Sequence, residues 1–109
     1  MSILISIIFS SILLSQDYPE LGSNESLDFM TWNVQNYPKS NQTNSYMEDI
    51  INDINVDIIA FQEIESLSAF SSLMNQLGSD WVGYRSGGNS SYGELAYAIN
   101  TNEIQILNI

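Results

Sequence analysis

Two apolar patterns alternate after residue 26, and their order constrains the fold more than any other feature of the sequence. Apolar runs of strand length occupy residues 27–33 and 56–62, and a stretch with helical apolar spacing follows each run. The two helical stripes comprise Met47, Ile50, Ile51 and Ile54 in the first, and Phe70, Leu73, Met74 and Leu77 in the second. This order predicts an α/β fold in which helices cover a sheet.

Small polar residues and glycine predict the helix ends. Ser45, with Glu48 three residues later, has the form of a capping box and predicts that the first helix starts there. Ser66 or Ser68 is expected to cap the second helix, and Gly78 is expected to end it.

The remaining segments predict one loop and three more strands. Pro38 is expected to keep residues 34–44 in a loop. Residues 81–86, 94–100 and 104–109 have the length and apolar content of strands. Because the last of these strands has no following segment to cover it, we expect the fold to be incomplete at residue 109.

The first 26 residues differ in composition from the rest of the chain. Residues 3–15 are apolar and uncharged, and they are shorter than the roughly 20 residues of a membrane span. They predict a signal peptide at residues 1–16 and a secreted or periplasmic protein, although no basic residue precedes them and a buried strand or helix is the alternative. Residues 17–26 are expected to form a linker to a single domain at 27–109.

The charge balance limits the possible partners. The chain has 13 acidic residues and 2 basic ones, a formal net charge of -11, which disfavours binding of a nucleic acid through a basic patch. A divalent cation held by carboxylates would reverse the local sign and would leave phosphate-directed chemistry open. The alternative is that the acidity only keeps the protein soluble.

The chain has no cysteine and no histidine. Thiolate chemistry, disulfides and the commonest transition-metal ligands are therefore excluded. Any metal site in this chain must be built from oxygen atoms, which favours Mg²⁺, Ca²⁺ or Mn²⁺.

Three polar residues lie at the ends of predicted strands. Asn33 closes the first strand, Glu63 follows the buried run at 56–62, and Glu94 opens the strand at 94–100. Carboxylate and amide oxygens at such positions suit a hard cation such as Mg²⁺. Taken singly, an asparagine here is more often a turn former, and a glutamate is more often part of the solvated surface.

Three stretches taken together resemble the start of the endonuclease/exonuclease/phosphatase superfamily. They are FMTWNVQNY at residues 29–37, VDIIAFQEIES at 56–66 and NSSYGELAYAIN at 89–100. The third is most similar to the branch of pancreatic-type deoxyribonucleases. The resemblance covers residues 27–109 and implies the N-terminal part of a four-layer α/β sandwich with two sheets.

The resemblance implies a role for each candidate residue. Glu63 is expected to be the main magnesium-binding carboxylate, and Asn33 is expected to lie beside the metal as a second metal-site residue and to take part in catalysis. Glu94 is expected to orient a catalytic histidine, and Tyr92 to contact the substrate. The implied reaction is hydrolysis of a phosphodiester or phosphomonoester, in which Mg²⁺ neutralises charge on the phosphate while a histidine–aspartate pair activates water.

The chain departs from the family pattern in its later motifs and beside its candidate residues. No Asp-x-Asn follows the third stretch, where the family carries one, and the chain has no histidine and no Ser-Asp-His, so it resembles an N-terminal portion that is inactive by itself. Glu65 and Gln35 stand where the deoxyribonuclease branch carries basic residues, which puts DNA as a substrate in doubt. Nucleic acid, sugar phosphate and phospholipid head group are all handled by this scaffold. A non-catalytic binding module on the same scaffold is the alternative function.

Overall fold

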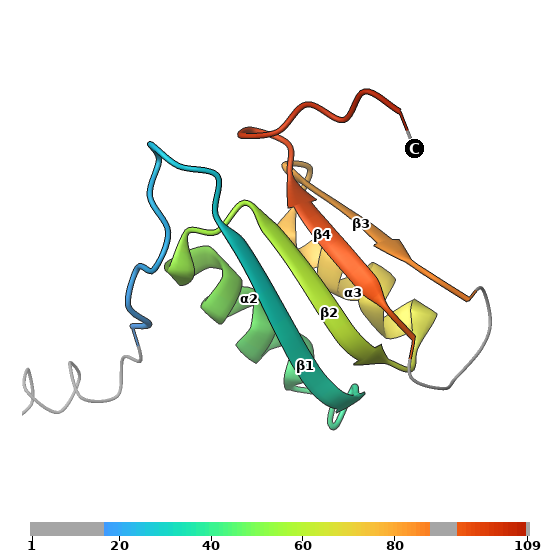
Figure 1. The fold of residues 1–109 in the computed structure, drawn as a ribbon. Helices are drawn as coiled ribbons and strands as arrows, with labels where there is room; N and C mark the ends of the chain where they lie inside the picture. Colours follow the sequence, from blue (N-terminus) through green and yellow to red (C-terminus); the bar gives the residue numbers. More distant parts are fainter. Residues whose placement is uncertain (1–16, 88–93, 109) are drawn as a thin grey trace, which may run out of the picture.

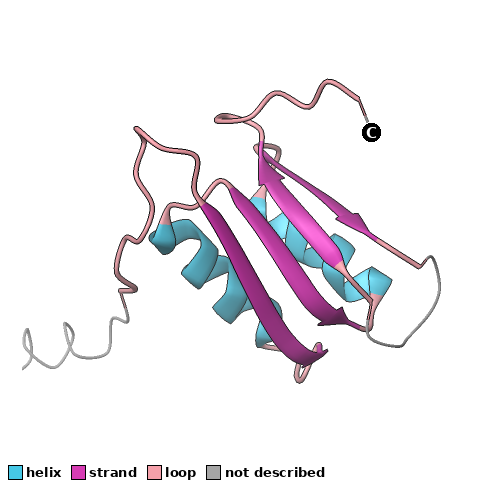
Figure 2. Cartoon of the chain, viewed as in Figure 1, coloured by secondary structure: helices cyan, strands magenta, loops and turns pink. Residues whose placement is uncertain are grey.

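The computed structural model describes residues 17–87 and 94–108, which form one four-stranded sheet and two helices (Figures 1 and 2). The elements along the chain are β1 (Phe29–Tyr37), α2 (Thr43–Ile54), β2 (Ile58–Ile64), α3 (Leu67–Leu77), β3 (Trp81–Arg85) and β4 (Ala96–Asn100). The predicted α/β fold is confirmed. The described residues form a single sheet, so the second sheet of the expected sandwich is not among them.

The strands lie in the order β1-β2-β4-β3. β1 and β2 run parallel, as expected for strands joined through a helix, and β4 runs antiparallel to both β2 and β3. The last residues of β1 and β2 and the first residues of β4 therefore meet at one edge of the sheet (Figure 1). This edge carries the three polar residues singled out in the sequence.

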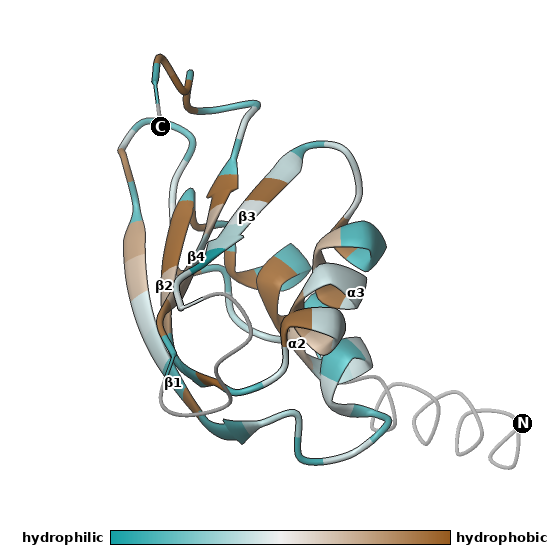
Figure 3. Cartoon of the chain, turned by 90° about the vertical axis from the view of Figure 1, so that its right-hand side faces the viewer, coloured by the Kyte–Doolittle hydropathy of each residue, from teal (hydrophilic) through white to brown (hydrophobic). Residues whose placement is uncertain are grey.

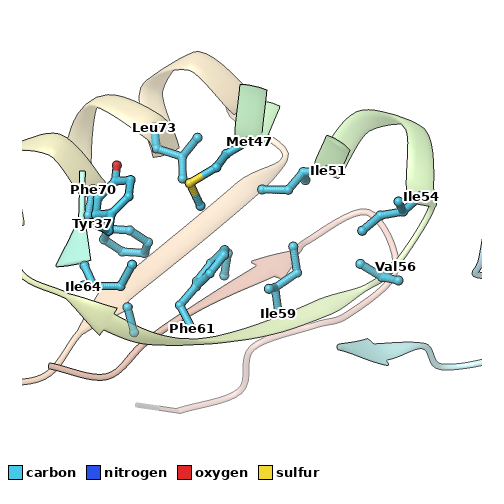
Figure 4. Close-up of a cluster of buried hydrophobic side chains, with 12 residues drawn as sticks. Tyr37, Met47, Ile51, Ile54, Val56, Ile59, Phe61, Ile64, Phe70 and Leu73 are labelled. Carbon is cyan, nitrogen blue, oxygen red and sulfur yellow. The ribbon is translucent and has the colours of Figure 1, made fainter. Parts of the chain in front are cut away.

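The hydrophobic core lies between the sheet and the two helices, which cover the same face of the sheet (Figure 3). Ile59 and Phe61 of β2 are fully buried beneath Ile51 of α2 and Leu73 of α3 (Figure 4). Burial of an apolar side chain of this size contributes roughly 1.5–3 kcal/mol to stability. Both predicted helical stripes face this core, and this confirms the helical periodicity.

The opposite face of the sheet carries no helix and is also apolar. Strand alternation and register place six large apolar residues on this open face: Phe29, Ile58, Val82, Tyr84, Tyr97 and Ile99. Phe29 is 62% exposed, and the rings of Tyr84 and Tyr97 lie 5.1 Å apart on the surface. A sheet with apolar side chains on both faces is typical of a sheet that is covered on both sides.

Several element boundaries differ from those predicted. α2 starts at Thr43, and its N-cap residue Gln42 makes no side-chain cap bond, so the capping box expected at Ser45 was wrong. The second helix behaves as predicted, because the Ser66 hydroxyl accepts the Ala69 N–H at 3.1 Å. Residues 104–108 form no strand, so the predicted strand there was also wrong.

The segment before β1 packs against the end of α2. The Leu21 and Gly22 N–H groups both donate to the Ile54 carbonyl at 2.9 Å. A Cβ at Gly22 would lie 1.6 Å from the Asn55 carbonyl oxygen, so only glycine allows this approach. The predicted signal peptide at residues 1–16 lies outside the described residues. Within 17–87 and 94–108, no helix is long and apolar enough to cross a membrane.

Candidate metal-binding site

Asn33 and Glu63 lie in direct contact at the shared edge of β1 and β2. The Asn33 side-chain nitrogen Nδ2 donates to Glu63 Oε1 at 3.2 Å, and the Asn36 backbone N–H donates to Glu63 Oε2 at 3.0 Å. Both carboxylate oxygens of Glu63 are therefore held by groups of β1. The two residues are far apart in the sequence, and the parallel pairing of the strands brings them together.

Hydrogen bonds to both the oxygen and the nitrogen of the Asn33 side-chain amide determine its orientation. Its Oδ1 accepts the Gln35 backbone N–H at 2.9 Å, while its Nδ2 faces the Glu63 carboxylate. A flipped amide would set a nitrogen against an N–H group and an oxygen against a carboxylate, so only the observed orientation satisfies all four groups. Asn33 is thus a turn former and a partner of Glu63 at once.

An irregularity in the pairing of β1 with β2 makes this contact possible. Asn33 pairs with Gln62, and the next pair is Tyr37 with Ile64, so three residues of β1 stand opposite one residue of β2. Gln35, Asn36 and Glu63 have positive φ angles of 38°, 55° and 62°. The bulge turns the Asn36 N–H toward Glu63, as bulges near functional sites often do.

The bulge also corrects the first prediction about this segment. Residues 34–37 were expected in a loop, but β1 continues to Tyr37, which is fully buried. Strict alternation would put Glu63 on the core face, beside Phe61 in the same strand. The left-handed conformation at Glu63 instead places Ile64 in the core and leaves Glu63 half-buried at the edge.

Glu94 lies on the other side of β2 from Asn33. Its backbone carbonyl accepts the Ile64 N–H at 2.9 Å, and its Oε2 accepts the Ser86 hydroxyl at 3.0 Å. The fold thus places all three candidate residues at one edge, with Glu63 between the other two. Tyr92, the expected substrate contact, lies outside the described residues.

The donor set around Glu63 fits only a cation that keeps most of its water. A carboxylate has about four lone-pair sites, and two of those on Glu63 accept hydrogen bonds, so each oxygen retains a site for a cation. In the part of the chain that the structure describes, no three acidic side chains are grouped to hold a metal. Mg²⁺ accepts one or two carboxylates and otherwise binds water and substrate oxygens, so Glu63 is a suitable partial site for it.

The sequence did not single out three groups that shape this site. The N–H groups of Gln35 and Asn36 act through the backbone, and only asparagine at 36 gives a weak sign of a left-handed turn. Arg85 donates through Nε to the Ile64 carbonyl at 2.9 Å and through Nη2 to the Glu65 carbonyl at 3.5 Å. One of the two basic residues of the chain is thus fixed beside the segment that follows Glu63.

Comparison with known proteins found no relative of this chain. No family model, no curated protein and no solved structure matches the chain. The chemistry of the site therefore follows from its own geometry.

Proposed function

We propose that this chain supplies the metal-binding carboxylate of a magnesium-dependent phosphoesterase of the endonuclease/exonuclease/phosphatase superfamily. The observation that carries the proposal is the contact between Asn33 and Glu63 at the shared end of two parallel strands. The resemblance of residues 27–109 to the start of that superfamily supports the same conclusion. The reaction would be hydrolysis of a phosphodiester or a phosphomonoester.

Each residue of the edge would have a distinct task in this function. Glu63 would hold Mg²⁺, which supplies a positive charge that stabilises the phosphate as the ester bond breaks. Asn33 would fix the direction of the Glu63 carboxylate, in the way that outer partners orient metal ligands. Glu94 would orient a histidine, and Tyr92 would contact the substrate. The histidine and the aspartate that activates water would come from sequence that this chain does not contain.

The apolar open face supports the two-sheet sandwich as the architecture of the complete enzyme. Phe29 and Tyr97 lie on this face, 62% and 38% exposed respectively. A second sheet packed against them would remove apolar surface from water at roughly 25 cal/mol per Å². Two packed sheets lie about 10 Å apart, and the side chains on their facing surfaces interdigitate in the space between. Side chains of the size of Phe29 and Tyr97 suit this distance.

A non-catalytic metal- or phosphate-binding module is the second candidate function. The absence of histidine from all 109 residues favours it, because the usual general base for hydrolysis is then missing. Both candidates require the Glu63 site, and they differ only in whether the chain belongs to a larger catalytic assembly.

Binding of Mn²⁺, a paramagnetic substitute for Mg²⁺, tests the site directly. In the ¹⁵N-labelled chain, Mn²⁺ should broaden the amide signals of Asn36 and Ile64, and excess Mg²⁺ should reverse the broadening. Glu63→Gln should abolish this effect, and Asn33→Ala should weaken it about 10- to 100-fold through loss of orientation. Glu48→Gln removes the same charge from α2 and serves as the matched control.

One result would refute the proposal, and another would distinguish its two candidate functions. Equal broadening in wild type and Glu63→Gln would show that the acidic surface binds the ion diffusely, and the proposal would fail. Site-specific Mn²⁺ binding without Mg²⁺-dependent cleavage of bis(4-nitrophenyl) phosphate, by a form of the protein that contains the later motifs, would favour the non-catalytic module.

A further inference from the structure

We propose that a groove between β1 and α2, next to Asn33, binds the organic group of the phosphoester and that this group is a planar ring. The inference rests on the proposed function, because it names the substrate class of the same site. The groove runs from β1 past Lys39 and Ser40 to the side of α2 that faces β1, and Asn33 is one of its lining residues. It has a volume of about 430 Å³, within the usual range for small-ligand sites.

The charge of the groove is the reverse of that of the whole molecule. None of its lining residues is acidic, although the chain has 13 acidic residues, and Lys39 is its single charged residue. The Lys39 ammonium donates to Gln35 Oε1 at 3.2 Å, which holds it near the bulge that carries the Glu63 site. The walls of the groove therefore carry one positive charge and no negative one, and this favours an anionic ligand.

The walls of the groove suit a flat apolar group attached to that anion. Trp32 lies on one side, its ring 6.0 Å from the ring of Phe61, and Tyr46 lies on the other side. The Tyr46 hydroxyl donates to Gln42 Oε1 at 3.0 Å, and its side chain is 57% exposed, which leaves the ring open to a ligand. Stacking on such rings favours any planar ring, whereas a sugar or inositol ring offers no flat π-face. A ring-bearing phosphoester therefore fits the groove better than a sugar phosphate.

Binding of simple phosphates to the metal-free chain tests the groove. In the presence of EDTA, phenyl phosphate should shift the amide signals of Gln35 and Tyr46, and it should bind about fivefold or more tightly than inorganic phosphate. Equal affinity of the two probes would overturn the inference. Shifts confined to the open face around Tyr97 would overturn it as well.

Three variants separate the ring contact from the charge contact. Tyr46→Gln should lower the affinity for phenyl phosphate about fivefold and leave inorganic phosphate unchanged. Lys39→Gln should weaken both probes. Leu67→Gln makes a similar change on the surface of α3, away from the groove, and should change neither. Unaltered phenyl phosphate binding in Tyr46→Gln would overturn the inference.

Two further probes distinguish the sources of a ring-bearing phosphate. Tighter binding of thymidine 5′-monophosphate than of O-phosphotyrosine would support a nucleotide, and the opposite order would support a phosphorylated aromatic side chain. The result is separable from the metal test. If Mn²⁺ does not bind at Glu63 but ring selectivity holds, the proposed function fails, and the groove is an anion site without a catalytic role. If Mn²⁺ binds and ring selectivity is absent, only the present inference fails.

Discussion

Three residues at the candidate site adopt a backbone conformation that L-amino acids rarely use. Gln35, Asn36 and Glu63 have positive φ angles, and asparagine alone among them tolerates this conformation well. The left-handed region costs other residues roughly 1–2 kcal/mol each. A hydrogen bond to a charged group contributes about 1.5–3 kcal/mol, and Glu63 accepts two of them. The bonds to the carboxylate thus offset the backbone cost.

Replacement of Gln35 tests whether its backbone is strained. Gln35→Ala and Gln35→Gly both remove the side chain that contacts Lys39, but only glycine adopts φ 38° without a Cβ clash. We expect the glycine variant to be more stable than the alanine variant by about 1 kcal/mol. Urea unfolding followed by circular dichroism measures this difference. An alanine variant that equals or exceeds the glycine variant would show that the conformation carries no strain.

At this scale the sequence pointed to the side chains that meet at the candidate site but not to its backbone donors. Glu63 and Asn33 could be found because each follows a recognisable apolar run. The Gln35 and Asn36 amides could not be found, because backbone N–H groups leave no mark on residue type and glutamine is not typical of left-handed turns. Arg85 was unremarkable in the sequence, since only the pairing of β3 with β4 brings it to the end of β2.

Among the elements, the two helices begin in different ways. Ser66 makes a side-chain cap for α3, as predicted from its position before an apolar stripe. α2 begins after a loop whose own bonds fix the chain, since the Thr43 hydroxyl accepts the Ser40 N–H at 3.0 Å. This turn allows the helix to start two residues before Ser45, which then lies inside its first turn. The sequence signature of a capping box was present, but the loop geometry overrode it.

Substitution of the two serines should separate the real cap from the apparent one. Ser66→Ala removes the acceptor for the Ala69 N–H and should lower the unfolding free energy by about 1 kcal/mol. Ser45→Ala replaces a residue inside a helix by a better helix former, so it should leave stability unchanged or raise it by a few tenths of a kcal/mol. Chemical denaturation of both variants measures the two values. A larger loss in Ser45→Ala would mean that α2 depends on Ser45 after all.

For the molecule as a whole, Tyr37 joins the sheet to both helices. Its hydroxyl donates to Asn44 Oδ1 in α2, and Asn44 Nδ2 donates to the Ala69 carbonyl in α3 at 2.9 Å. Tyr37 is fully buried. Burial raises the pKa of its phenol far above the ordinary value of 10.0, and the bond to Asn44 offsets this only in part. The neutral phenol is therefore a condition for the native packing of all three elements.

This raised pKa predicts a loss of stability in alkali. Above about pH 10 the phenol ionises in the unfolded chain while it stays protonated in the native one, so stability falls by up to about 1.4 kcal/mol per pH unit. Below pH 10 the phenol is protonated in both the native and the unfolded chain, so Tyr37 does not make stability depend on pH there. Tyr37→Phe should be less stable than wild type at pH 8 but should lose less stability between pH 8 and pH 11. An equal loss in both proteins, measured by urea unfolding, would contradict the assignment to Tyr37.

The overall architecture was predicted more fully than its boundaries. The order of apolar runs and helical stripes was enough to predict an α/β sheet with helices on it. The position of β4 between β2 and β3 could not be predicted, because several strand orders satisfy the same apolar pattern. The open face likewise could not be recognised, since a run such as residues 56–62 does not tell which of its two faces is covered.

The bulge at residues 34–36 also makes this stretch sensitive to changes in length. Tyr37 enters the core and the Asn36 amide meets Glu63 only because three residues of β1 stand opposite one residue of β2. Deletion or insertion of a single residue here would move the side chains that follow it, up to Tyr37, to the opposite face of the sheet. Natural variation should therefore change the side chains at 34 and 35 far more readily than the number of residues between Asn33 and Tyr37.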